Sequence, residues 1–136
     1  MVREIIHDPI FLSQKSVEAT AADIPIVHDL MDTLRANLDR CVGMADNMIG
    51  QRKRIIAIAK GPLVVAMLNP KILSRTGEYE TEESCLSLEG TRKATRFRAI
   101  RLSWQDMRMR EHVGILEGFQ AQIVQHEIDH CDGKLI

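Results

Sequence analysis

The chain has 136 residues, of which 45% are hydrophobic and 27% are charged, proportions typical of a globular protein. This composition excludes a disordered tail, a collagen-like fibre and a coiled coil, and predicts a single domain over residues 1–136. Eighteen basic and 19 acidic residues leave a formal net charge of −1, so no overall field attracts nucleic acid or an anionic membrane.

No segment has the pattern of a membrane span or an export signal. The longest apolar run, residues 63–68, is far shorter than the roughly 20 residues that a span needs, and the first residues lead into no apolar stretch. Three cysteines are an odd number and too few for a disulfide scaffold, which favours reduced thiols. We therefore expect a cytoplasmic protein without membrane contact.

The first strong helical pattern covers residues 25–40. Asp23 can cap its start, and Pro25 suits a first turn. Apolar residues then recur on one helical face: Val27, Leu30, Met31, Leu34 and Leu38.

The middle of the chain has the pattern of a sheet. Residues 54–59 and 63–68 are short apolar runs separated by Lys-Gly-Pro, a break typical of a hairpin. Residues 71–74, 85–88 and 94–103 are weaker strand candidates. These runs predict an antiparallel arrangement.

A second strong helical pattern covers residues 112–131, with Gly133 as its stop signal. The residues spaced to lie along one face of this predicted helix, which we call its stripe, are Leu116, Phe119, Ile123, His126 and His130. A helix, several strands and a final helix predict an α+β fold in which a curved antiparallel sheet packs around the C-terminal helix.

The main chemical signal is His-Glu-Ile-Asp-His at residues 126–130. Two histidines at i and i+4 of a helix project to the same side and can bind one divalent ion. Glu127 between them can take a proton from water and deliver it to a leaving nitrogen. The alternative is a surface helix with solvated histidines. His126 and His130 continue the apolar face of the predicted helix, so their rings should point into the domain. We favour a metal site, because a bound metal ion would provide a partner for these two buried imidazoles.

A catalytic metal site usually has three protein ligands and one open position. Cys85 is the best candidate for the third ligand, with a buried structural cysteine as the alternative. Cys131 is rotated about 100° from His130 on the helix and should face away. Cys41 lies at the end of the first helix and has no matching context.

The sequence resembles the peptide deformylase family. Residues 125–130 match its motif Q-H-E-x-D-H, and residues 83–87 (ESCLS) are similar to its motif E-G-C-x-S. The resemblance extends to residues 3–6, the first helix, Asn69-Pro70 and residues 133–135, so it spans nearly the whole chain.

The resemblance implies a peptide deformylase-like fold and a metallohydrolase that removes the N-formyl group from the formyl-methionine of nascent polypeptides. The implied ligands are Cys85, His126 and His130, with water in the fourth position. Glu127 would act as general base and then general acid, and the backbone N–H of Leu86 would stabilise the oxyanion. The implied native ion is Fe2+, with Zn2+, Ni2+ or Co2+ able to replace it.

The family's first motif, G-x-G-x-A-A-x-Q, is altered at residues 41–48. Only Gly43 and Ala45 match, and Met48, which cannot donate a hydrogen bond, replaces the glutamine that supplies a second oxyanion donor. Losing one such donor costs about 10²–10³ in rate in other hydrolases. Asn47 or Gln51 could supply a substitute amide, although neither is in register. In the second motif, Ser84 replaces glycine.

The substrate pocket of the family is an apolar cavity beside the metal helix. Phe119 and Ile123 lie on the metal-binding stripe, and Gly43 and Met44 should lie opposite, with Met48 close to the reacting atoms. The alternative for each of these residues is an ordinary place in the core.

Basic residues cluster between residues 92 and 110, with Phe97 and Trp104 among them. The cluster consists of Arg92, Lys93, Arg96, Arg98, Arg101, Arg108 and Arg110. It could contact ribosomal RNA or form a solvated sheet edge on which charge discourages unwanted pairing. We favour the edge and expect at most a transient ribosome contact, with no specific nucleic-acid partner.

Two alternatives to deformylation follow from the altered motifs. One is an amide hydrolase with the same metal and glutamate but a different acyl specificity, suggested by Asp46, Met48 and Ser84. The other is a metal-bound module that binds nascent chains or a partner without catalysis. The intact Glu127 argues against the second, because a purely structural site needs no general base.

Overall fold

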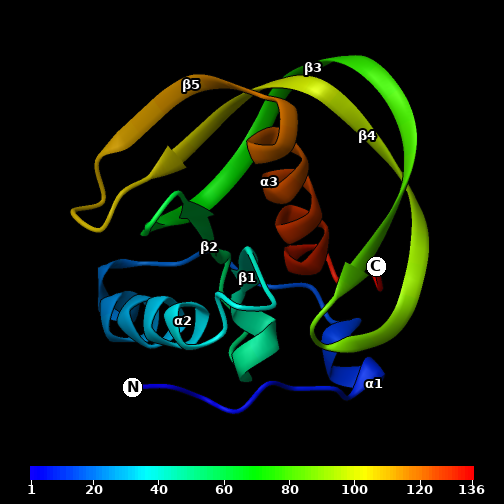
Figure 1. Ribbon diagram of the computed structural model, residues 1–136. Coiled ribbons are helices and arrows are strands. Elements are labelled where there is room, and N and C mark those ends of the chain that lie inside the picture. Colours follow the sequence, from blue (N-terminus) through cyan, green and yellow to red (C-terminus); the bar gives the residue numbers. More distant parts are fainter.

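Five strands form one antiparallel sheet in the order β1-β2-β3-β4-β5, so each strand pairs with its neighbour in sequence (Figure 1). The computed structural model describes all residues from 1 to 136. The strands are β1 (Gly43–Ala45), β2 (Ile55–Lys60), β3 (Leu63–Cys85), β4 (Leu88–Gln105) and β5 (Glu111–Glu117). The predicted α+β class, with an antiparallel sheet and a C-terminal helix, is confirmed.

Two long helices cover opposite faces of this sheet. They are α2 (Ile24–Ala36) and α3 (Gly118–Cys131), and the shorter elements are α1 (Pro9–Leu12) and the 3₁₀ turns η1 (Ala21–Asp23) and η2 (Asp46–Ile49). None of these helices combines the length and the apolar character needed to cross a membrane.

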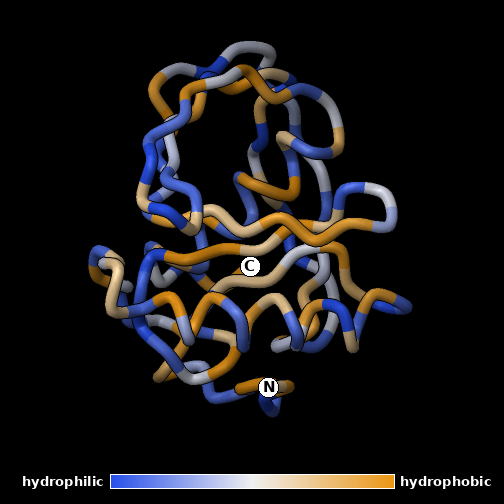
Figure 2. Tube along the Cα trace, turned by 90° about the vertical axis from the view of Figure 1, so that its left-hand side faces the viewer, coloured by the Kyte–Doolittle hydropathy of each residue, from blue (hydrophilic) through white to orange (hydrophobic).

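β2 is buried on both of its faces, which explains its continuous apolar sequence. Ile55 and Ala57 face the core beneath α2, whereas Ile56 and Ile58 face the core beneath α3. This alternation follows the two-residue period of a strand. Figure 2 shows the hydrophobic strands concentrated across the middle of the trace. The sheet thus separates two cores, and α3 is held firmly against one of them.

α2 ends at Ala36, about one turn earlier than the pattern predicts. Asn37 follows it, donates from Nδ2 to the Thr33 carbonyl at 2.7 Å and accepts from Arg40 at 2.8 Å. These side-chain bonds replace the next helical turn. Leu38 is therefore outside the helix and 37% exposed, and its predicted place on the buried face is wrong.

The predicted helix over residues 112–131 also begins too early, because its first part is strand β5. Leu116 pairs with Ile100 of β4, and its side chain packs against the core beneath α3. The position of Leu116 fits the helical period of 3.6 residues and the strand period of two residues equally well. Periodicity alone therefore could not distinguish a helix from a strand at this position. Gly118, with a φ of +62°, separates the strand from the helix in a conformation that favours glycine.

β3 and β4 form a long ribbon that arches over α3 (Figure 1). The separate strands predicted at residues 63–68 and 71–74 merge into β3 through register shifts after Leu68 and Ile72. Residues 85–88 are not a strand: β3 ends at Cys85, β4 begins at Leu88, and the turn lies between them. The arch of this ribbon carries Cys85 back to α3.

Candidate metal centre and its pocket

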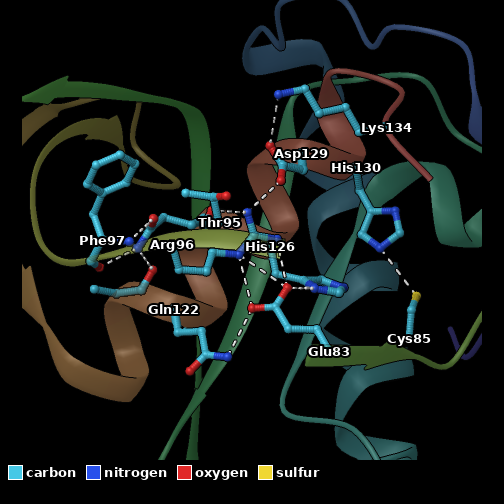
Figure 3. Close-up of polar contacts among 12 residues, drawn as sticks. Glu83, Cys85, Thr95, Arg96, Phe97, Gln122, His126, Asp129, His130 and Lys134 are labelled. Atoms are coloured by element: carbon cyan, nitrogen blue, oxygen red, sulfur yellow. Dashed lines mark hydrogen bonds and ion pairs between the residues drawn. The ribbon is translucent and has the colours of Figure 1, made fainter. Parts of the chain in front are cut away.

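α3 and the end of β3 bring three potential metal ligands together. His126 and His130 are one helical turn apart, with ring centroids separated by 5.0 Å. The Sγ of Cys85 lies 3.2 Å from Nε2 of His130 (Figure 3). The ligand atoms of Cys85, His126 and His130 all lie within 4.8 Å of one another. The predicted trio therefore converges at one point.

The C-terminal end of α3 is fixed directly after His130. The N–H of Gly133 donates to the His130 carbonyl at 3.0 Å, and the N–H of Lys134 donates to the Asp129 carbonyl at 2.9 Å, which together form a Schellman motif. Gly133 has a φ of +76°, as its expected role as a stop signal requires. Cys131 packs in the core beneath α3, away from the three ligands.

A buried ion-pair network holds His126 from behind (Figure 3). Its Nδ1 lies 2.8 Å from Oε1 of Glu83, and a carboxylate can only accept, so Nδ1 carries the proton and Nε2 is left for a metal. Arg96 donates to both oxygens of Glu83, at 2.7 and 3.0 Å, and to Asp129 at 2.7 Å. Such partners orient a metal-ligating imidazole.

Sequence reasoning missed this network. It placed Arg96 within a solvated basic cluster, but the side chain is only 4% exposed, which corrects that expectation. The alternation of side chains along β4 could have indicated that Arg96 is buried. It falls on the same face of the strand as Ala94 and Ile100, which are both buried.

The remaining basic residues partly fit the favoured sheet-edge interpretation. β4 pairs with β5 only from Ala99 onward, so its earlier part has β3 on one side alone. There, Arg92 and Lys93 lie directly across from Glu83 and Glu82. This arrangement places an acidic residue opposite two of the basic residues in this part of the strand.

The network separates the charge states of the two histidines. Burial alone would lower the pKa of His126, but hydrogen bonds with Cys85 and Glu83 outweigh it and raise the pKa to about 10. Burial, assisted by the charges of His126 and Arg96, lowers the pKa of His130 to about 3. Burial also opposes the charge on Glu83, but bonds from His126, Arg96 and Gln122 hold its pKa at about 2.

Glu127 is buried beside the ligands, and its Oε1 has no hydrogen-bond partner. Burial raises the pKa of this carboxyl to about 7, a value suited to accepting and returning a proton near neutral pH. A Cβ added to Gly43 would lie 2.7 Å from Oε2 of Glu127 and 2.7 Å from the side chain of Ile123. Glycine at position 43 is therefore required for β1 to approach α3 this closely.

A pocket of about 560 Å³ opens onto this centre. Gly43, Met48, Phe119 and Ile123 line it, together with Leu86, Gln122 and the inner faces of Cys85, His126 and Glu127. Phe119 is 63% exposed, so it forms the mouth of the pocket and is not a core residue.

Met44 does not line the pocket and must be removed from the predicted substrate-binding set. Its side chain is fully buried in the core beneath α2. Successive residues of a strand point to opposite faces, so Gly43 and Ala45 of β1 face α3, whereas Met44 between them faces α2.

No amide from the first-motif segment replaces the missing glutamine. Met48 lines the pocket, but its Sδ accepts from the N–H of Ala45 at 3.5 Å. Asn47 uses its Nδ2 on the carbonyls of His130 and Leu12, at 2.9 and 3.4 Å, so it ties α3 to the N-terminal segment. Gln51 is not among the pocket residues. The amide in the pocket is that of Gln122, which sequence reasoning did not identify.

Asp46 is the least expected residue of the altered motif. It is fully buried, and neither carboxylate oxygen has a hydrogen-bond partner. Burial, together with the nearby charges of Asp23 and Asp29, raises its pKa to about 8. It does not line the pocket, so its effect falls on stability.

The donor set fits a divalent transition metal. One thiolate and two imidazoles suit Fe2+, Zn2+, Co2+ and Ni2+, and three protein ligands leave a position open for catalysis. Nδ1 of His126 is held by Glu83, which leaves Nε2 as the nitrogen that would bind the metal. A centre of this kind, next to an unpaired buried glutamate on an antiparallel α+β scaffold, defines a metal-dependent hydrolase.

Comparison with known proteins gives a consistent result. A model of the family described as polypeptide deformylase matches residues 2–136. A peptide deformylase of Clostridium beijerinckii is 50% identical over 136 residues, 100% of both chains. Peptide deformylase 1 of Clostridium perfringens is 37% identical over 81% of this chain and 76% of its own. The chain belongs to the polypeptide deformylase family.

Solved structures agree. The peptide deformylase of Thermotoga maritima superposes with a TM-score of 0.88 at 27% identity, over 99% of this chain and 95% of the other. A class I type b peptide deformylase of Acinetobacter baumannii bound to Met-Ala-Ser gives 0.86 at 27% identity, over 99% and 97%. The chain is thus a metal-dependent enzyme that removes the formyl group from formylated nascent peptides.

Proposed function

We propose that Cys85, His126 and His130 hold the catalytic metal ion and that Glu127 transfers the protons of the reaction. The observation that carries this proposal is the convergence of the three donor atoms within 4.8 Å beside the unpaired Oε1 of Glu127. We take Fe2+ as the native ion, with Zn2+, Ni2+ or Co2+ as substitutes that the same donors accept.

The ion, when bound, supplies Lewis-acid polarisation of the formyl carbonyl and makes water more acidic. Glu127 takes a proton from the attacking water and returns it to the leaving nitrogen of the peptide. Burial favours this role because it raises the pKa of Glu127 to about 7. Leu86 follows Cys85 in the β3–β4 turn and lines the pocket, and its backbone N–H stabilises the developing oxyanion.

The N-terminal side chain of the substrate occupies the pocket formed by Gly43, Met48, Phe119 and Ile123. These residues provide apolar surface next to the ligands, where burial of a methionine side chain is favourable. Because Gly43 lies against Glu127, a peptide seated along β1 is held next to the general base.

The substrate also implies where the enzyme works. Nascent chains carry the formyl group while they are made, so we place the protein in the cytoplasm, with a transient ribosome contact. Two basic residues of β4, Arg92 and Lys93, lie across from acidic residues of β3, and the net charge of −1 argues against specific nucleic-acid binding.

The test is turnover of formyl-Met-Ala-Ser by protein purified anaerobically with Fe2+ or reconstituted with Ni2+. Glu127→Ala at equal metal loading is the control, and we expect it to lower kcat by about 10²–10⁴. Acetyl-Met-Ala-Ser is assayed in parallel. Faster turnover of the acetyl peptide would indicate altered acyl specificity. No turnover by folded, fully metallated protein would instead indicate a binding module.

A further inference from the structure

Gln122 is the feature of the pocket that the deformylase mechanism leaves unexplained. It lies on α3 one turn before His126, half-buried, and lines the pocket together with apolar Met48, Phe119 and Ile123. Two buried carboxyl groups lie close to it: Glu83 is bonded by Arg96 and His126, and Glu127 has the proposed role of proton carrier. Gln122 carries the one side-chain amide among the residues that line the pocket.

Two hydrogen bonds fix the orientation of this amide. Its Nε2 donates to Oε2 of Glu83 at 2.9 Å, and its Oε1 accepts from the hydroxyl of Tyr79 at 3.4 Å. Glu83 is itself held by Arg96 (Figure 3). The amide consequently cannot turn away from the pocket without breaking bonds to two neighbouring residues.

The bonded amide retains one unused donor. A glutamine Nε2 carries two hydrogens, and Glu83 accepts only one of them. When a substrate side chain fills the pocket and excludes water, this second N–H needs an acceptor, because a buried donor without one destabilises the complex. A purely hydrocarbon side chain offers none, a thioether sulfur is a weak acceptor, and a sulfoxide oxygen is a strong one.

We propose that Gln122 is a specificity-determining residue that selects substrates whose N-terminal side chain carries an acceptor near its end. The pocket then prefers formyl-methionine over its hydrocarbon analogue formyl-norleucine and also accepts formyl-methionine sulfoxide. This inference rests on the proposed function, because it requires the side chain of a formylated peptide to occupy this pocket.

The experiment compares three peptides, formyl-Met-Ala-Ser, formyl-norleucyl-Ala-Ser and formyl-methionine-sulfoxide-Ala-Ser, with the nickel-loaded protein. We expect kcat/KM for methionine to exceed that for norleucine by about tenfold, mainly through KM. Gln122→Leu keeps the approximate size but removes the donor, so the ratio should fall to within about twofold and the sulfoxide should become the poorest substrate. Phe119→Leu reshapes the mouth of the pocket without touching the amide and should retain the preference.

A merely structural role would give a different pattern. If Gln122 acts only by supporting Glu83 and His126, Gln122→Leu lowers kcat for all three peptides by the same factor, and this result would overturn the inference. Binding of the products Met-Ala-Ser and norleucyl-Ala-Ser, measured by calorimetry on nickel-loaded protein, gives a second readout. If no peptide is hydrolysed, the proposed function fails, but the binding ratio of wild type and Gln122→Leu still decides the role of Gln122.

Discussion

The two walls of the pocket have been built under different constraints. On one wall, formed by α3 and the end of β3, each of Glu83, Arg96 and His126 bonds to its neighbours in a closed network. On the opposite wall, formed by β1 and η2, the thioether of Met48 replaces the amide of the family motif. Asp46 of η2, which lies outside the pocket, is buried without a partner. The metal wall follows the family motif closely, whereas the opposite wall departs from it at most positions.

The physical reason is the difference in what each wall must do. A metal site fixes the direction of every ligand atom, so its supporting residues tolerate little change. The opposite wall must mainly provide the shape of the pocket. Its one strict requirement is the close approach of β1 to Glu127, which Gly43 allows because it has no side chain. Changes on the metal wall should therefore affect metal binding, and changes on the opposite wall should affect rate or stability.

The largest effect is expected from Cys85→Ser, which removes a ligand from the metal wall. Losing an outer-shell partner typically lowers metal affinity about 10–100-fold, so losing a ligand should lower it by more than about a hundredfold. Metal content after dialysis against a chelator provides the measurement, with circular dichroism to verify the fold. Cys41→Ser changes the other thiol of the pocket and should retain the metal. Equal metal content in the two variants would exclude Cys85 as a ligand.

A smaller effect on the same wall is expected from Arg96→Lys. Lysine keeps the positive charge but cannot form the forked contact with Glu83 or reach Asp129 at the same time. Glu83 then orients His126 less well, and metal affinity should fall about tenfold. The dissociation constant for Zn2+, measured by chelator competition, tests this. The same exchange at Arg98, which lies over the ring of Tyr79, should leave that constant unchanged. An unaltered value for Arg96→Lys would show that the network does not support the metal.

On the opposite wall, Met48→Gln should increase the rate. The Sδ of Met48 already accepts from the N–H of Ala45, so a glutamine carbonyl at this position can take the same bond and leave its amide for the oxyanion. We expect kcat for formyl-Met-Ala-Ser to rise about tenfold or more, because one oxyanion donor is worth about 10²–10³ in other hydrolases.

Met48→Leu is the matched control for this prediction, because it alters the same side chain without adding a donor. Its kcat should not rise. Similar rates for the glutamine and leucine variants would mean that the present enzyme stabilises the oxyanion without help from position 48.

The same contrast explains how much could be predicted from the sequence. The i and i+4 spacing of His126 and His130 is a local property of one helix, so it could be recognised without a structure. Cys85 could be proposed by exclusion and by family resemblance. The network behind His126 joins Glu83 and Arg96 to a helix more than 25 residues further along the chain, and no periodicity indicates such pairings.

The errors in the predicted pocket residues, one on each wall, have specific causes. Met44 is expected beside Gly43 because the sequence shows no strand there: β1 is only three residues long, too short to display a two-residue alternation. Gln122 is not predicted because it is polar, whereas the face of α3 that lines the pocket is recognised in the sequence by its apolar residues. A polar residue on that face is the signal that could have identified it.

The smallest effect, on stability alone, is expected from Asp46. Burial raises its pKa to about 8 in the folded protein, whereas an unfolded aspartate titrates near 3.9. Between about pH 4 and pH 8 the folded state therefore holds a proton that the unfolded state releases. Its free energy of unfolding should fall as the pH rises, by up to about 1.4 kcal/mol per pH unit. This contribution is complete below about pH 4 and lost above about pH 8.

Asp46→Asn keeps the shape of the side chain but removes the titrating group, and Asp46→Ala introduces the residue of the family motif. Urea unfolding at pH 5, 6.5 and 8 should show a flatter pH dependence for both variants than for wild type. At pH 8 the alanine variant should be more stable than wild type, since it buries no carboxylate. Because Asp46 lies outside the pocket, deformylation of formyl-Met-Ala-Ser should be unchanged. Parallel pH profiles of stability for wild type and Asp46→Asn would show that Asp46 is ionised in the folded protein, with a partner that compensates its burial.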